Sequence, residues 1–144
     1  SAYIGAGRIT EAIEASKILV DNEPNDKIYR YNYGVLLLNA ERYSEAETQL
    51  LEALKIDPEY ENAIYNLGVT YVKWGTAMNK EAEQKGTISE DYKKKYEAAL
   101  PYSEKVVEKD ATNVAIWELL GKVYSVLGMT DDANNAFKKA DELR

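Results

Sequence analysis

The chain has neither cysteine nor histidine. Without cysteine it can form no disulfide, and no thiolate is available as a nucleophile or a metal ligand. Without histidine it has no imidazole to act as a general base near neutral pH or to bind zinc. Any catalysis or metal binding would therefore have to rely on carboxylates.

Proline is scarce and long apolar runs are missing. The 144 residues include 3 prolines and 8 glycines, while Leu, Ala, Glu and Lys are abundant, which favours an all-α fold. No apolar run approaches the roughly 18 residues of a membrane span. The net charge of -7 argues against nucleic acid and anionic membranes as partners, because both require a basic surface.

The apolar and small residues near the end of the chain follow a fixed spacing. One group falls at i, i+3, i+4 and i+7, one face of a helix, and a second group follows a break at Gly128. The residues are Trp117, Leu120, Gly121, Tyr124, Gly128, Ala133, Phe137 and Ala140. This pattern resembles the tetratricopeptide repeat, particularly its bacterial members.

The same pattern recurs earlier in the chain at a separation of 34 residues. It relates Pro24 to Pro58, Gly34 to Gly68, and Ala12 to Ala46. The spacing divides a single domain of residues 1–144 into a truncated repeat (1–24), a complete repeat (25–58), a repeat with an insertion (59–111) and a last repeat (112–144). The first repeat lacks most of its first helix, which suggests a fragment of a longer protein.

Cap residues set the expected helix limits. In the truncated repeat, Thr10 is expected to cap a helix that ends near Asp21. In the complete repeat, helices are expected from Asp26 to Ala40 and from Ser44 to Ile56. Ser44 with Glu47 resembles a capping box.

The third repeat is 19 residues longer than the others, because Gly68 and Gly121 are 53 residues apart. The excess lies near 76–98, in sequence rich in Ala, Glu and Lys. We expect two antiparallel helical extensions, each of roughly 9 residues or about 14 Å. They would be joined near 85–89, with either Thr87 and Glu90 or Ser89 as the cap.

Beyond the insertion, Pro101 is interpreted as a bend within a helix that continues past it. Thr112 or Asn113 is expected to cap the first helix of the last repeat. Its second helix is expected to start after Thr130.

The resemblance implies a right-handed superhelix, or solenoid, of antiparallel helix pairs, whose first helices line a concave groove. By register, the groove residues are Tyr31, Asn32, Val35, Asn39, Tyr65, Asn66, Val69, Lys73, Glu118 and Lys122. The same register adds Ile28, Leu38, Asn62, Val72, Ala115, Leu119, Ser125 and Val126. Such a groove suits an extended or helical peptide; the alternative is that several of these residues pack against the neighbouring second helix.

One subtype of the family binds a partner's terminal carboxylate through lysines, arginine and asparagines. Asn32 and Asn66 are compatible with its amide positions. Ala115 and Leu119 stand where that subtype has cations, so this form of recognition is disfavoured.

Aromatic residues give two open interpretations. Tyr3, Tyr29, Tyr31 and Tyr65 either mark a recognition surface or pack between helices. Trp74 either anchors the inserted hairpin to the body of the protein or contacts a partner.

The acidic pairs Glu81/Glu83 and Asp131/Asp132 are the remaining candidates for chemistry. The first pair lies in solvated helical sequence, and the second lies at a helix start, where acidic residues are favoured by the helix dipole. We therefore expect no enzyme activity, no cofactor and no metal.

Together these features predict a non-catalytic scaffold for protein–protein interaction that binds a peptide or protein in its groove. The alternative is a self-assembly module in which uncapped terminal helices of different chains stack. Cytoplasm and bacterial cell envelope are both compatible with the sequence.

Overall fold

The computed structural model describes residues 2–144, except for the side chains of residues 2–4 and 6, so the hypothesis about the Tyr3 side chain lies outside the described part. Within that part the chain forms seven helices and no strand, as the composition predicts. It divides into two compact units, Ser1–Asn66 and Leu67–Arg144. Each unit is described by itself.

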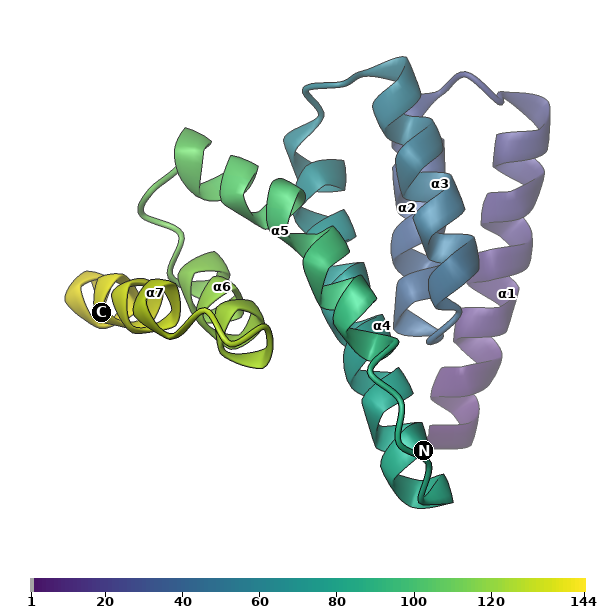
Figure 1. The fold of residues 1–144 in the computed structure, drawn as a ribbon. Coiled ribbons are helices and arrows are strands. Elements are labelled where there is room, and N and C mark those ends of the chain that lie inside the picture. The colour runs from purple at the N-terminus through teal and green to yellow at the C-terminus, as the bar shows by residue number, and fades with distance from the viewer. Residues whose placement is uncertain (1) are drawn as a thin grey trace. The chain divides into compact units, whose positions relative to one another are not determined.

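The first unit contains α1 (Ala2–Asn22), α2 (Lys27–Asn39), α3 (Tyr43–Ile56) and the start of α4 (Glu61–Lys85). Helices α1, α2 and α3 lie side by side, and consecutive helices run in opposite directions (Figure 1). Their facing sides are apolar and small, so burial of these side chains holds the helices together. The buried residues include Ile13, Val20, Leu37, Ala46, Leu50 and Ala53.

Helix α1 is continuous from Ala2 to Asn22. The expectation of a new helix beginning at a Thr10 cap is therefore wrong, because Thr10 lies in the middle of α1. A glycine inside a helix costs only about 1 kcal/mol relative to alanine, which is too little to end the helix at Gly7.

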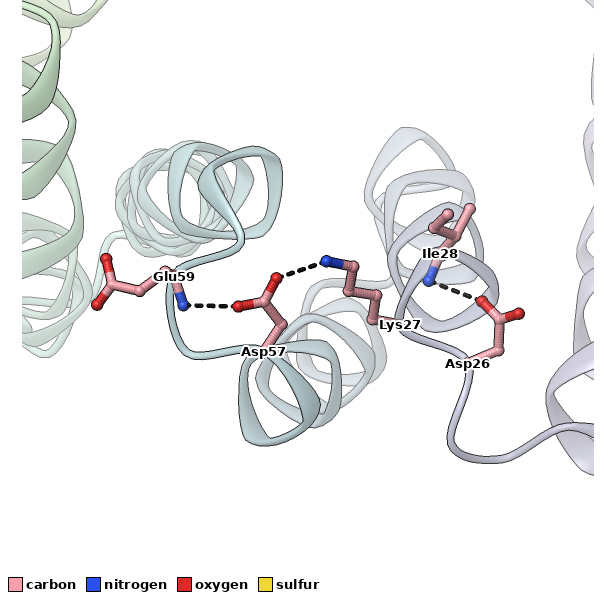
Figure 2. Close-up of polar contacts among 5 residues, drawn as sticks. All are labelled: Asp26, Lys27, Ile28, Asp57 and Glu59. Carbon is pink, nitrogen blue, oxygen red and sulfur yellow. Dashed lines mark hydrogen bonds and ion pairs between the residues drawn. The ribbon is translucent and has the colours of Figure 1, made fainter.

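Helix α2 begins where the sequence predicts. The Asp26 carboxylate accepts hydrogen bonds from the amides of Ile28 at 2.9 Å and Tyr29 at 3.0 Å, as Figure 2 shows for Ile28. These bonds satisfy two amides of the first turn that have no partner within the helix.

The turn between α2 and α3 contradicts the predicted capping box. Glu41 has a φ of 62°, and the amide of Arg42 donates to the carbonyl of Leu37 at 2.9 Å. This tight turn lets α3 begin at Tyr43, and Arg42 precedes it without a side-chain cap. Ser44 is thus already inside the first turn of the helix, where its hydroxyl cannot act as the cap.

The second unit contains the rest of α4, α5 (Tyr92–Lys109), α6 (Val114–Val126) and α7 (Thr130–Leu143). Helix α5 continues through Pro101, as predicted. Asn113 caps α6 by accepting the amide of Ile116 at 3.1 Å, which settles the choice between Thr112 and Asn113. The core of this unit includes Leu67, Ala99, Ile116, Leu120, Val123, Ala133 and Ala140.

Helices α4 and α5 are longer than their counterparts. Helix α4 has 25 residues against 13 in α2 and α6, and α5 has 18 against 14 in α3 and α7. Helix α4 ends at Lys85 and α5 begins at Tyr92, so the connection lies close to the expected junction near 85–89. The extra length is not divided evenly as expected, since α4 carries most of it.

Gly86, with a φ of 66°, ends α4, and the amide of Thr87 donates to the carbonyl of Ala82 at 3.0 Å. This bond across the helix end is the Schellman motif. Thr87 therefore closes α4 and does not cap α5. Ser89 lies nearer that role, since its hydroxyl accepts the amide of Asp91 at 3.3 Å, just before α5.

A glycine on the first helix of each pair faces a side chain of the second helix. A Cβ atom built on Gly34 would lie 2.9 Å from Cγ of Leu50, and one on Gly121 would lie 2.5 Å from Cε1 of Phe137. In the second unit a Cβ on Gly68 would lie 2.5 Å from Oγ of Ser103. These glycines let the paired helices approach closely, as the sequence pattern predicts for Gly34.

Replacing Gly121 with alanine tests this close approach. We expect Gly121→Ala to lower the free energy of unfolding by about 1–2 kcal/mol, because the new methyl group meets the ring of Phe137. Urea unfolding followed by circular dichroism measures the change.

Gly7→Ala is the matched control, since Gly7 has nothing within 4 Å of the added Cβ. It should raise stability by up to about 1 kcal/mol through helix propensity alone. Equal effects of the two substitutions would contradict the packing explanation.

The left-handed backbone at Glu41 makes a second prediction. Glu41→Gly should stabilise the protein by about 0.5 kcal/mol, because glycine adopts a positive φ without the steric cost that a Cβ imposes. Thermal unfolding compared with Glu45→Gly, a change inside α3 that should destabilise, separates this backbone effect from the loss of charge. A lower melting temperature for Glu41→Gly would contradict it.

Candidate protein-binding surfaces

The ten residues predicted to line the groove all keep solvent access. Asn32, Asn39, Lys73 and Lys122 are exposed, and the other six are partly buried. Two further positions of the same register, Leu38 and Val72, are 4% and 5% exposed and belong to the core instead. The alternative of packing therefore holds for these two.

In the first unit the structure brings two of the predicted residues together. The side-chain amide of Asn66 on α4 donates to the hydroxyl of Tyr31 on α2 at 3.1 Å, and also to the carbonyl of Asn62 at 3.0 Å. The Tyr31 ring meets Tyr60 edge-on, with 5.3 Å between the ring centres. The first helices of neighbouring repeats are thus joined by side chains that remain partly solvent-exposed.

Lys27 and Asp57 extend this arrangement, although neither is at a groove position of the repeat register. The Lys27 ammonium donates to the Asp57 carboxylate at 2.5 Å, and the other oxygen of Asp57 accepts the amide of Glu59 at 3.1 Å (Figure 2). The same ammonium lies 4.9 Å from the ring centre of Tyr60. The hydrogen bond with the Asp57 carboxylate raises the pKa of Lys27.

Partial burial sets the state of the Tyr31 hydroxyl. Burial, and to a lesser degree the nearby Tyr60, raise the pKa of Tyr31 above its ordinary value. The hydroxyl therefore stays neutral at physiological pH and can both donate and accept a hydrogen bond. Together with the exposed amides of Asn32 and Asn39, the face offers the groups that pair with a peptide backbone.

In the second unit a different set of polar groups joins α4 to α6. The Lys122 ammonium donates to the hydroxyl of Thr76 at 3.3 Å, and the hydroxyls of Thr76 and Tyr96 lie 2.6 Å apart. Val69 lies two turns before Thr76 and Lys73 one turn before it, on the same side of α4. The repeat register predicts Lys73 and Lys122 as groove residues but not Thr76, which lies beyond the usual length of a first helix.

Glu118 is already engaged with another residue of the chain. Its carboxylate forms an ion pair with the guanidinium of Arg144, which also pairs with Asp141. Glu118 is therefore less available to a partner than its place in the register suggests.

Trp74 contacts the second helix of the hairpin. The ammonium of Lys95 on α5 lies 3.5 Å from a ring centre of Trp74 on α4, close enough for a cation–π interaction. The two lysines before it pair with acids three residues earlier, Lys93 with Glu90 and Lys94 with Asp91. This basic run is thus used inside the hairpin.

A shallow hollow of about 250 Å³ lies at the end of the second unit, between Ala111, Trp117, Lys139, Glu142 and Leu143. The indole of Trp117 donates to the carbonyl of Ala111 at 2.8 Å, and Lys139 lies 4.5 Å from its ring centre. Trp117 therefore orders the turn before α6 as well as packing against α7.

The acidic pairs form no chelating cluster. Glu81 pairs with Lys85 at 2.6 Å, and within the described residues no group of three or more carboxylates gathers as a metal site would require. The helices of residues 2–144 include none that combines the length and the hydropathy of a membrane span.

The arrangement of paired antiparallel helices defines a helical repeat protein. Residues 1–61 match the Tetratricopeptide repeat family. This match agrees with the resemblance to the tetratricopeptide repeat that the residue spacing indicates.

Solved structures share this fold. MamA 41-end from Desulfovibrio magneticus RS-1 is 26% identical with a TM-score of 0.79, over 97% of this chain and 68% of that one. A second MamA crystal structure is 23% identical with a TM-score of 0.75, over 98% of this chain and 67% of the other, and it supports the fold alone.

A curated relative matches only locally. The inactive TPR repeat-containing thioredoxin TTL3 of Arabidopsis thaliana is 33% identical over 73 residues. That match covers 51% of this chain and 11% of the relative. The similarity is therefore limited to a short repeat-containing part of the relative and does not include its other parts.

Tyr124 provides a pH-dependent test of the second unit. Its hydroxyl donates to the Glu104 carboxylate at 2.8 Å, and burial together with this carboxylate raises the pKa of Tyr124 well above its ordinary value. Because the folded pKa exceeds the unfolded value of about 10, the stabilisation is complete below that pH and is lost above it.

We therefore expect the free energy of unfolding to fall more steeply above about pH 10 in the wild type than in Tyr124→Phe. Urea unfolding at several pH values measures the two slopes. Tyr102→Phe serves as the control for the many other tyrosines, and identical slopes for wild type and Tyr124→Phe would rule out the proposed linkage.

Proposed function

We propose that the protein is a non-catalytic scaffold that binds a protein or peptide segment through the exposed sides of its first helices. In the first unit this face belongs to α2 and the start of α4. The observation that carries the proposal is the pairing of Tyr31 with Asn66, two residues that keep solvent access.

The chemistry of this face suits a peptide. Neutral amides and hydroxyls can hydrogen-bond a backbone, and tyrosine buries a large area at a small cost in conformational entropy. Because the Tyr31 ring is already held against Tyr60, little further ordering is needed when a partner binds.

A non-catalytic role is supported by the family and by the acidic residues themselves. Proteins built from this repeat are generally scaffolds. The two acidic pairs considered from the sequence lie on helix surfaces, where each carboxylate is solvated or paired with a neighbouring lysine.

Self-assembly is the second candidate function, and exposed apolar side chains favour it. On α1, Ile18 and Leu19 are 61% and 44% exposed, and on α7, Phe137 and Leu143 are 40% and 39% exposed. Each helix therefore presents apolar area that a second chain could bury.

Substituting the two predicted groove tyrosines tests the first function. Tyr31→Ala with Tyr65→Ala should reduce the amount of a captured partner by about tenfold or more, because aromatic anchors dominate binding energy. Affinity capture from an extract of the source cells, quantified by mass spectrometry, compares the double variant with Tyr43→Ala, which removes a tyrosine from a second helix.

Light scattering over a wide concentration range distinguishes the two candidates. A constant mass, with capture lost only in the double variant, supports groove binding. Equal capture by the double variant and Tyr43→Ala would overturn it. A mass that rises with concentration, and falls after Ile18→Ser and Leu143→Ser, would support self-assembly.

A further inference from the structure

We propose that Lys73, Lys80 and Lys122, gathered around Thr76 in the second unit, bind an acidic protein segment. We call these four residues the lysine cluster. The proposal rests on the scaffold function and deepens it by naming the chemical class of the partner.

Geometry places the cluster on two helices. Lys73, Thr76 and Lys80 occur at i, i+3 and i+7 along α4, so they share one side of the helix. Lys122 reaches the same place from α6, with its ammonium 3.3 Å from the hydroxyl of Thr76.

Hydrogen bonds orient the Lys122 ammonium. The Thr76 hydroxyl donates to the carbonyl of Val72 at 2.8 Å, so the buried Tyr96 hydroxyl and the Lys122 ammonium are its donors. A lysine ammonium has three donors, and this contact uses one of them. The remaining two are available to an incoming oxygen.

The cluster's cations lack acidic partners. Across the described residues, no carboxylate lies within ion-pair distance of Lys73, Lys80 or Lys122. Other lysines of the same hairpin, including Lys85 and Lys93, are paired. In a chain with a net charge of -7, a group of uncompensated cations is a distinct local feature.

The contacts of Glu118 explain why Lys122 has no acidic partner. Glu118 lies four residues before Lys122 on α6, a spacing that favours an ion pair between glutamate and lysine. Its carboxylate instead pairs with Arg144. The pairing with Arg144 thus leaves Lys122 available for a ligand.

The dimensions of the cluster favour a chain over a small anion. Seven residues of α4 separate Lys73 from Lys80, which is about 10 Å at 1.5 Å per residue. An extended peptide advances about 3.3 Å per residue, so acidic side chains at alternate positions are spaced about 7 Å apart. Two or three of them can reach separate amines of the cluster, whereas one small anion cannot.

The cluster differs from the terminal-carboxylate clamp that the sequence disfavours. That clamp would use the positions of Ala115 and Leu119, which carry no charge here. Thr76 and Lys80 are residues 16 and 20 of α4, beyond the 13-residue length of α2 and α6. The extra length of α4 therefore creates the site. A nucleic acid is disfavoured because the acidic surface of the chain repels a phosphate backbone.

Fluorescence anisotropy with a defined probe tests the proposal. The probe is a fluorescein-labelled peptide of eight residues that alternates Glu with Ser, and the matched peptide alternates Gln with Ser. Lys73→Gln and Lys122→Gln should each weaken binding of the acidic peptide by about two- to fivefold, and the double variant by about tenfold. Lys138→Gln, which removes the same charge from exposed α7, should leave binding unchanged.

The outcomes separate this proposal from the scaffold function. Binding of the acidic peptide that depends on Lys73 and Lys122 and weakens with added salt supports the cluster. Equal binding of both peptides, equal loss in Lys138→Gln, or tighter binding of single-stranded DNA of the same length would overturn it. Absent peptide binding combined with partner capture that still requires Tyr31 and Tyr65 would overturn the cluster alone and leave the scaffold intact.

Discussion

The close approach of the two helices in each pair is the constraint on which the rest of the structure depends. It is set by a residue without a side chain on the first helix, Gly34 or Gly121, facing the residue 16 positions later, Leu50 or Phe137. A Cβ atom at either glycine would push the helices apart, and the side chains that depend on their spacing would move with them. Gly68 takes the same role opposite Ser103, whose buried hydroxyl has no hydrogen-bond partner within the described residues.

The polar residues between neighbouring first helices serve structure and recognition together. Tyr31 with Asn66 in the first unit, and Thr76 with Lys122 in the second, each join two helices while remaining partly exposed. Such groups are pre-organised, because their rotamers are fixed before a partner arrives. They also link binding to stability, so a substitution at Tyr31 is best interpreted together with a measurement of unfolding.

Much of the fold could be predicted because the repeat combines helical periodicity with strong end signals. Asp26 and Asn113 lie directly before apolar helical faces and cap as their chemistry predicts. The capping signals in the sequence predicted the wrong helix start where the turn before the helix has an unusual backbone conformation. The predicted Ser44 capping box does not form, because the left-handed backbone at Glu41 lets the helix start earlier. Positive φ angles are predicted mainly at glycine, so the sequence does not reveal this turn. Among the candidate site residues, the repeat register predicted Tyr31 and Asn66. The contact of Thr76 with Lys122 depends on how the extra residues are divided between α4 and α5, which the spacing of repeat residues does not reveal.

The turn between α4 and α5 has a practical consequence. Residues 86–91 are all exposed, and the Ile88 side chain is 101% exposed, so it makes no packing contribution. The bonds that close α4 end at Thr87. An epitope tag or a small fluorescent domain inserted after Ile88 would lengthen a solvated connection and displace no core atom, and the entropy cost of a longer loop grows only slowly with its length. The hairpin thus offers a solvated place in the second unit to attach a reporter.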